Sequence, residues 1–441
     1  MPRSSSLVVG SFLALSAMFG SAAAGCSGPV INSIPYCNSV DCLGYSNIGY
    51  GGEYQDVIAM DKDTCTCTYA PKQFSNAPGA PVNEPLSIHF RGPLSLKQFA
   101  FYTADNKKSK RSEEHLRRHA HGHNKHRRAA EPDLVIVTAQ TTIYKTVGPE
   151  GTPLPSDVKN DGPPHAPNPP SSKVKTDTPP KKTDTPDLSS AGTFTRQAYY
   201  NSKQGVSDGL VFMNHRGGQG SGDFDMGCLG LSISYANKDN TAGSANPECM
   251  GDITIPSDGE FIIFSDKKCE GNDCGFYRPG IPAYHGFAGD IRVFAFEFIM
   301  PRDKGDIAGK AAPDIPAIWA LNAKVPRTSQ YGIKSGHCSC WPACPEVDIF
   351  EALPGNPAAG QSAIDMMKTH IHSEQGGKYG GGGNNDYFDR PLDKTMKLAA
   401  IFSGENIFIT KLPDNTNFDK SFSENLIADA KKATSIFKIG N

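Results

Sequence analysis

The chain has 441 residues, of which 38% are hydrophobic and 20% are charged, and its formal net charge is −2 at pH 7. This length predicts two or three domains of about 150 residues each. The near-zero charge argues against nucleic acid as a general partner, because such proteins usually carry a basic domain or stripe. The negative mean hydropathy argues against a multi-span membrane protein. The 45 glycines and 34 prolines favour loops and β-structure over long helices.

The first 24 residues have the features of a secretory signal peptide. Arg3 supplies the positive charge, residues 7–19 form an apolar stretch, and residues 22–24 offer a small-residue cleavage site. The stretch is shorter than the ~20 apolar residues that a membrane span needs. No later stretch is long and apolar enough to span a bilayer, and residues 435–441 do not resemble a glycolipid-anchor signal. We therefore expect a secreted, extracellular protein without a membrane anchor.

All 12 cysteines follow this segment, so they enter an oxidising compartment in which disulfides form. Five lie within residues 26–67 and seven within residues 228–344. Because both numbers are odd, either one bridge joins the two groups or each group keeps a free thiol. The spacing does not decide the connectivity. Cys338, Cys340 and Cys344, with His337, form an alternative zinc-binding set, but the oxidising compartment favours disulfides for these cysteines.

Residues 25–104 predict a small Cys-rich β module, because apolar and polar residues alternate over residues 86–90 and 94–102. Residues 105–190 predict a disordered linker with a basic, His-rich part and then a Pro-rich part that cannot pack a core. Dibasic pairs at Lys110-Arg111 and Arg127-Arg128 leave open processing by a kexin-type protease. A weaker alternative is loose metal binding by His115, His119, His121, His123 and His126.

Residues 191–441 predict the main domain, an all-β sandwich, since short strand-like runs recur between Gly and Pro turns. The apolar spacing near the end of the chain indicates one helix over residues 423–433. The expected strands cover residues 209–213, 260–265, 291–300, 316–323, 346–353, 396–402 and 406–412.

The most informative segment is residues 345–352, in which Glu346, Asp348 and Glu351 alternate with apolar residues. Glu346 and Asp348 share one face of a strand because side chains alternate between faces. Glu351 joins that face only if a β-bulge within residues 349–350 inserts one extra residue, and bulges are common beside active sites. A simple solvated acidic edge is the alternative, but the neighbouring apolar run at residues 316–322 argues against it.

Paired carboxylates near aromatic side chains are what cleavage of a glycosidic bond requires. One carboxylate attacks or stabilises the oxocarbenium-like centre, and the other donates a proton to the leaving oxygen. The two tryptophans of the chain, Trp319 and Trp341, lie within ~30 residues of the acids. The segment therefore predicts a glycosidase.

The pattern Glu-x-Asp-x-x-Glu resembles the bulged signature of glycoside hydrolase family 16. That resemblance implies a β-jelly roll and hydrolysis of β-1,3- or mixed-linkage glucans with retention of configuration. It implies that Glu346 is the nucleophile, that Asp348 orients it, and that Glu351 is the general acid and then the base. Residues 369–372 resemble a strand that places a histidine, here His372, near the acids. Trp319 and Trp341 then become candidate sugar-binding platforms.

A closer resemblance, to the fungal "target of SBF" cell-wall proteins, covers most of the chain after the signal. It rests on residues 86–94, 279–287, 322–328 and 338–341. It implies β-1,3-glucan of the cell wall as the partner, with no cofactor and no metal. Three functions stay open: an endo-β-1,3-glucanase, a wall transglycosylase using the same residues, and a non-catalytic structural or glucan-binding wall protein. The Cys-rich module is either a glucan-binding unit or a spacer.

Overall fold

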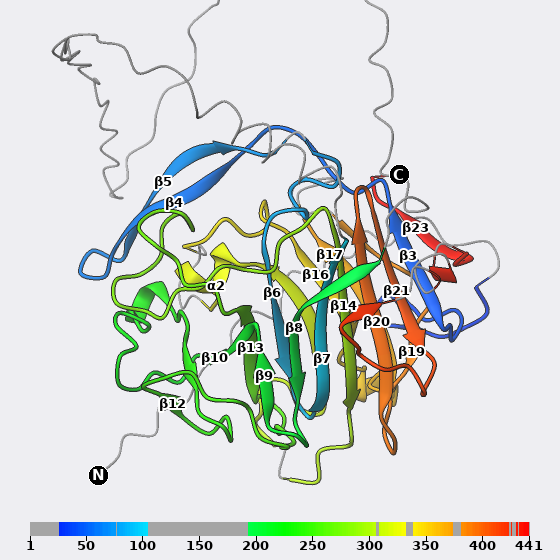
Figure 1. Cartoon of the computed structure of the whole chain (residues 1–441). Coiled ribbons are helices and arrows are strands. Elements are labelled where there is room, and N and C mark those ends of the chain that lie inside the picture. Colours follow the sequence, from blue (N-terminus) through cyan, green and yellow to red (C-terminus); the bar gives the residue numbers. More distant parts are fainter. Residues whose placement is uncertain are drawn as a thin grey trace, which may run out of the picture. The chain divides into compact units, whose positions relative to one another are not determined.

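A computed structural model describes the Cys-rich and main segments, and nearly all regular secondary structure in its described residues is β-strand (Figure 1). The described residues are 26–75, 77–104, 193–305, 308–331, 338–373, 381–422, 425, 429–430 and 432–440. The predicted signal peptide, linker, dibasic pairs and His337 lie outside them. Among the described helices, none has the length and apolar character that crossing a membrane requires.

The first of two large sheets contains ten strands and carries the acidic segment. Its neighbouring strands pair antiparallel throughout. In order across the sheet, they are β12 (Gly243–Ser244), β11 (Ser234–Ala236), β10 (Leu210–Asn214), β13 (Glu260–Ser265), β6 (Leu86–Arg91), β15 (Ala317–Asn322), β16 (Glu346–Glu351), β17 (Met366–His372) and β18 (Gly381–Gly383), with β19 (Phe388–Asp389) also paired to β17.

The second sheet contains nine strands and forms the other layer of the sandwich. Its strands pair antiparallel except at one edge, where the last strand of the chain runs parallel to β3. In order, they are β22 (Ser421–Phe422), β8 (Phe194–Asn201), β7 (Ser95–Ala104), β14 (Ile291–Ile299), β20 (Met396–Ser403), β21 (Asn406–Leu412), β3 (Cys42–Ser46) and β23 (Ser435–Lys438), with β9 (Val206–Asp208) paired to β8.

The core lies between these two sheets. Phe90 of β6 meets Phe296 of β14 with ring centroids 6.1 Å apart, and Phe350 of β16 meets Phe298 of β14 at 5.3 Å. Alternate residues of each strand enter this core, as Ile88 and Phe90 do in β6. The other side chains therefore point to the opposite face of the ten-stranded sheet, which we call the acid face because Glu346, Asp348 and Glu351 lie on it.

The all-β sandwich expected from the sequence is confirmed, and the strands that the sequence predicted are present with ends within one or two residues of the expected ones. Of the predicted helix over residues 423–433, the described residues Asn425, Asp429 and Ala430 are helical. Elsewhere in the described residues, the helices are short: η2 (Gly227–Leu229), α2 (Lys324–Thr328) and η3 (Pro357–Ala359).

The expectation that residues 25–104 form a separate module is corrected. β6 lies between β13 and β15, β7 lies between β8 and β14, and β3 pairs with β21, so these early strands complete the two main sheets. The physical reason is that a buried, alternating strand needs hydrogen-bonded neighbours on both sides. The neighbours of β3, β6 and β7 are all strands that follow residue 190. Among the described residues of this region, only two small hairpins pair within it, β1–β2 (Val30–Ile31, Ile34–Pro35) and β4–β5 (Glu53–Asp61, Thr66–Gln73).

Disulfides join the early strands to the later ones. The odd cysteine counts suggested either one bridge between the two groups or one free thiol in each group. The structure has one free thiol in each group, Cys42 and Cys249, and in addition two bridges that cross between the groups. The pairing uses Cys338, Cys340 and Cys344 in bridges, which excludes the zinc-binding alternative for them. The bridges are Cys26–Cys37, Cys65–Cys228, Cys67–Cys338, Cys269–Cys274 and Cys340–Cys344.

Cutting the chain between residues 105 and 190 is expected to leave one folded molecule made of two chains. Two disulfides and the strand pairing of β6 and β7 hold the parts together. After limited cleavage at the dibasic pairs, a non-reducing gel should show a single species, and a reducing gel should show two. The melting temperature should stay within a few degrees of that of the uncut protein. Two separable pieces under non-reducing conditions would contradict this connectivity.

Candidate active site

The strand β16 holds its three acids on one face by means of a bulge. Trp319 of β15 pairs with Asp348, whereas its neighbour Ile318 pairs with Phe350, so Ile349 has no partner on that side. On the other side, Asp348 and Glu351 lie opposite His370 and Lys368, so two residues of β16 face one of β17. Ile349 and Phe350 both enter the core. The bulge expected within residues 349–350 is therefore present, and it returns Glu351 to the face of Glu346 and Asp348.

Glu351 belongs to a row of cross-strand neighbours on five adjacent strands, four of which contribute an ionisable residue. The cross-strand partners in this row are Glu260, Arg91, Ala317, Glu351 and Lys368. Because Ala317 is small, the Arg91 side chain extends over β15, and its Nη2 donates to Glu351 Oε1 at 2.9 Å. Arg91 therefore places a positive charge near both carboxylates of the row, Glu260 and Glu351.

Asp348 belongs to a second row, in which the other three side chains carry aromatic or imidazole rings. The partners are His89, Trp319, Asp348 and His370. The His89 and Trp319 rings stack with centroids 5.1 Å apart. Asp348 itself accepts from a side chain of the next row, because His372 Nε2 lies 3.0 Å from Asp348 Oδ2. Sequence reasoning had placed His372 near the acids, and the structure brings the two together.

Glu346 belongs to the third row, with Leu321 on one side and His372 on the other. It accepts a hydrogen bond at 3.0 Å from the indole Nε1 of Trp341, which lies in the loop just before β16. Each of the three acids thus has its own donor from a different segment. These three donors are what make three carboxylates on one face of a strand tolerable.

The electrostatics of the acids follow from this crowding. Burial is the main cause that raises the pKa of Glu346 above its usual value, and the negative charges of Asp348 and Glu351 raise it further. Burial and Asp348 likewise raise the pKa of Glu351, against the opposing effect of Arg91. For His372, burial lowers the pKa, but the carboxylates of Asp348, Glu346 and Glu351 together outweigh burial and raise it to about 9. The site therefore retains protons at neutral pH that free carboxylates would have lost.

The two tryptophans lie beside the acids in different settings. Trp341 is half-buried, with its indole nitrogen on Glu346. Trp319 is only 5% exposed, because Tyr54, Phe74 and the Cys340–Cys344 loop cover it. Stacking of a sugar on Trp319 would require these covering residues to move, and its role as a platform stays a prediction.

Sequence reasoning missed several polar residues of the acid face. Arg91 and His89 come from β6, and a fourth hydrogen-bonded acid, Glu260, accepts from Tyr331 at 2.6 Å. The alternation of polar and apolar residues in residues 86–91 showed which side chains leave the core. It did not show that they approach acids some 260 positions later in the chain. That proximity depends on the order of strands in the sheet.

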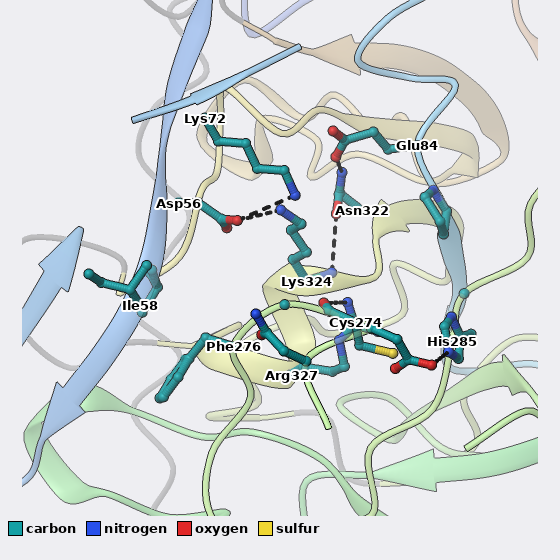
Figure 2. Close-up of a pocket in the computed structure, with 16 residues that line it drawn as sticks. Asp56, Ile58, Lys72, Glu84, Cys274, Phe276, His285, Asn322, Lys324 and Arg327 are labelled. Carbon is teal, nitrogen blue, oxygen red and sulfur yellow. Dashed lines mark hydrogen bonds and ion pairs between the residues drawn. The ribbon is translucent and has the colours of Figure 1, made fainter. Parts of the chain in front are cut away.

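A cavity of about 510 Å³ lies between β4, the end of β15, α2 and the loop over residues 272–286, and none of the three acids lines it. Figure 2 shows Lys72 and Lys324 both directed at Asp56, with Nζ to Oδ2 distances of 3.7 and 2.6 Å. Asn322 donates to Glu84 at 2.8 Å on the opposite wall. Asp56 of β4 pairs with Lys324 of α2, so an ion pair across the cavity links the β4–β5 hairpin to the segment that follows β15.

Comparisons with known proteins identify what the chain is similar to. Residues 192–430 match the family described as "Cell wall protein YJL171C/Tos1, C-terminal", and residues 41–104 match its N-terminal counterpart. The "Probable circularly permuted 1,3-beta-glucanase TOS1" of Candida albicans is 37% identical over 97% of both chains. The protein of the same name in Saccharomyces cerevisiae is 37% identical over 89% of this chain and 90% of its own. No solved structure matches the chain.

The raised pKa of Glu346 predicts how stability changes with pH. A carboxyl whose folded-state pKa is raised contributes stability below its unfolded pKa, and the contribution is lost as pH rises through the folded value. Replacing Glu346 with Gln removes this loss. We expect the variant to match the wild type near pH 4 and to be more stable at pH 8, on the order of 1 kcal/mol or about 2–4 °C in melting temperature.

Thermal melts at both pH values check this expectation, with Glu405→Gln in the exposed β20–β21 turn as the matched control. For this control, the melting temperature should differ from that of wild type by the same amount at both pH values. A Glu346→Gln variant that is less stable than wild type at pH 8 would contradict the assigned direction.

Proposed function

The chain belongs to the Tos1 family of cell wall proteins, and we propose that it is a retaining endo-β-1,3-glucanase that acts on wall glucan. The observation that carries the proposal is the bulged strand, which presents Glu346 and Glu351 on one face with Asp348 between them. The relatives bear the name of probable 1,3-β-glucanases, which supports the same substrate class for this chain.

In the first step, Glu346 attacks the anomeric carbon while the glycosidic C–O bond breaks. The leaving oxygen takes the proton of Glu351, and an ester forms between Glu346 and the sugar. The hydrogen bond from Trp341 holds the attacking carboxylate in place. Burial and neighbouring carboxylates raise the pKa of both Glu346 and Glu351, so we expect the pair to keep one proton near the working pH. In the proposed mechanism Glu351 holds that proton as the acid, and Glu346 is ionised.

In the second step, Glu351 accepts a proton from water, and the water oxygen attacks the anomeric carbon and releases Glu346. Retention requires the two carboxyl groups to approach within about 5–5.5 Å. The bulge puts both carboxyl groups on one face of β16, which this approach needs. Asp348, fixed by His372, orients Glu346 from the same face.

The proposed site of action is the cell wall, reached by secretion. The family description and the signal-like residues 1–24 support this route. Processing at Lys110-Arg111 and Arg127-Arg128 is part of the same proposal. The two disulfides that cross between early and late cysteines would keep a processed protein in one piece.

Incubation of the purified secreted protein with laminarin-type β-1,3-glucan tests the proposal. Wild type should produce shorter chains, and Glu346→Gln should lose turnover by at least about 10²–10⁴-fold while keeping its fold. Glu405→Gln should keep full activity. Longer products would instead identify a transglycosylase, in which a sugar takes the place of water. A folded wild type that leaves both laminarin and mixed-linkage glucan unchanged would identify a non-catalytic wall protein.

Replacement of Arg91 with Met tests the assignment of Glu351 as the acid. The guanidinium lowers the pKa of Glu351, so its removal should raise that pKa. Because the acid must be protonated, the basic limb of the pH–rate profile should then move to higher pH, by about one unit or more, as is typical when an adjacent opposite charge is removed. Arg302→Met, which alters an ion pair away from the acid face, serves as the control. An unchanged basic limb would show that another group is the acid.

A further inference from the structure

The acid face contains a cluster of three potential metal ligands that the proposed reaction does not require. His370 and His372 lie two residues apart on β17, so both point to the acid face beside Asp348. His372 Nε2 lies 3.0 Å from Asp348 Oδ2 and 3.3 Å from His370 Nδ1. One ligand atom from each of the three residues lies within 4.8 Å of the other two.

Asp348 Oδ2, His370 Nδ1 and His372 Nε2 carry too few hydrogens for both short contacts to be hydrogen bonds. The carboxylate oxygen only accepts, and each imidazole nitrogen carries at most one hydrogen. If His372 Nε2 donates to Asp348, that nitrogen cannot accept a hydrogen bond from His370. If instead His370 Nδ1 donates to His372, then Asp348 loses its donor. One of the two short contacts is therefore left without a hydrogen in either arrangement, whereas a cation between the three atoms would be bound by all of them.

The spacing fits a tetrahedral ion. Two ligand atoms about 2.1 Å from a zinc ion are about 3.4 Å apart at the tetrahedral angle. The contacts of 3.0 and 3.3 Å need only a small opening to reach that value. Two imidazoles and one carboxylate are also a usual protein ligand set for zinc, with the fourth position left to a water.

The cluster is reachable from solvent, because the side chain of His372 is 24% exposed. We propose that Asp348, His370 and His372 form a binding site for a divalent cation of the Zn²⁺ class, and that occupation of the site excludes glucan cleavage. The inhibitory part rests on the proposed function. A bound ion takes the carboxylate that lies between Glu346 and Glu351, and it places a hydrated cation where the sugar must approach those acids.

A second cluster in the described residues provides a matched control. Cys269, Asp273, Cys274 and His285 also gather within ligand distance of one another. The two cysteines form a disulfide, so they offer no thiolates. That leaves two candidate ligands in this cluster, Asp273 and His285, one fewer than in the cluster on the acid face. Replacement of His285 should therefore leave zinc binding unchanged.

Calorimetric titration of metal-free full-length protein with Zn²⁺ tests the site. The five histidines of residues 115–126 are present in every variant, so their weak binding cancels in the comparison. Wild type and His285→Ala should each bind one equivalent of Zn²⁺ that His370→Ala does not. Asp348→Asn, which preserves the shape of the side chain, should lose the same equivalent. Equal titrations of wild type and both site variants, all folded by circular dichroism, would overturn the proposal.

Laminarin turnover measured in the same Zn²⁺ series separates this inference from the proposed function. Zn²⁺ should inhibit wild type with a midpoint that matches the calorimetric one. Glu346→Gln keeps all three ligands, so it should bind the same equivalent. Binding without any glucan turnover would defeat the proposed function and leave the metal site standing. Turnover that Zn²⁺ does not reduce at full occupancy would overturn the inhibitory part.

Discussion

The site depends on one local irregularity, the extra residue that β16 accommodates at Ile349 and Phe350. Without it, Glu351 would turn toward the core among the side chains of β14 and β19, and Glu346 would lose its partner. With it, three carboxylates lie on one face of a strand whose other face is fully buried. That arrangement is electrostatically unfavourable, so the structure around it consists largely of groups that make it tolerable.

Those groups come from distant parts of the chain. Arg91 belongs to β6, Trp341 to the disulfide-closed loop before β16, and His372 to β17. The early strand β6 is central, because it lies two strands from β16 and only a long side chain crossing over Ala317 can reach Glu351. This explains why the early segment cannot be a detachable module. Its residues neutralise an acid encoded some 260 positions later.

The sequence predicted the strand that carries the acids, the bulge within it and the sandwich around it, because hydrophobic alternation and carboxylate spacing are local signals. It also placed His372 near the acids through a family resemblance. It could not show that β6 and β7 complete the main sheets, since strand order is a non-local property. Arg91, His89 and His370 were missed for the same reason, as each gains its meaning only from its cross-strand neighbours.

The most direct test of the central claim is to trap the covalent intermediate on Glu346. The probe is a 2-deoxy-2-fluoro-β-glucosyl fluoride. Its 2-fluoro group slows release of the sugar from the enzyme, so the ester can be located by peptide mass spectrometry. The expected result is a single added sugar on the peptide that contains Glu346, and no label on Glu346→Gln. A label on Glu351 or on an acid outside β16 would contradict it, as would an unlabelled wild type that cleaves laminarin under the same conditions.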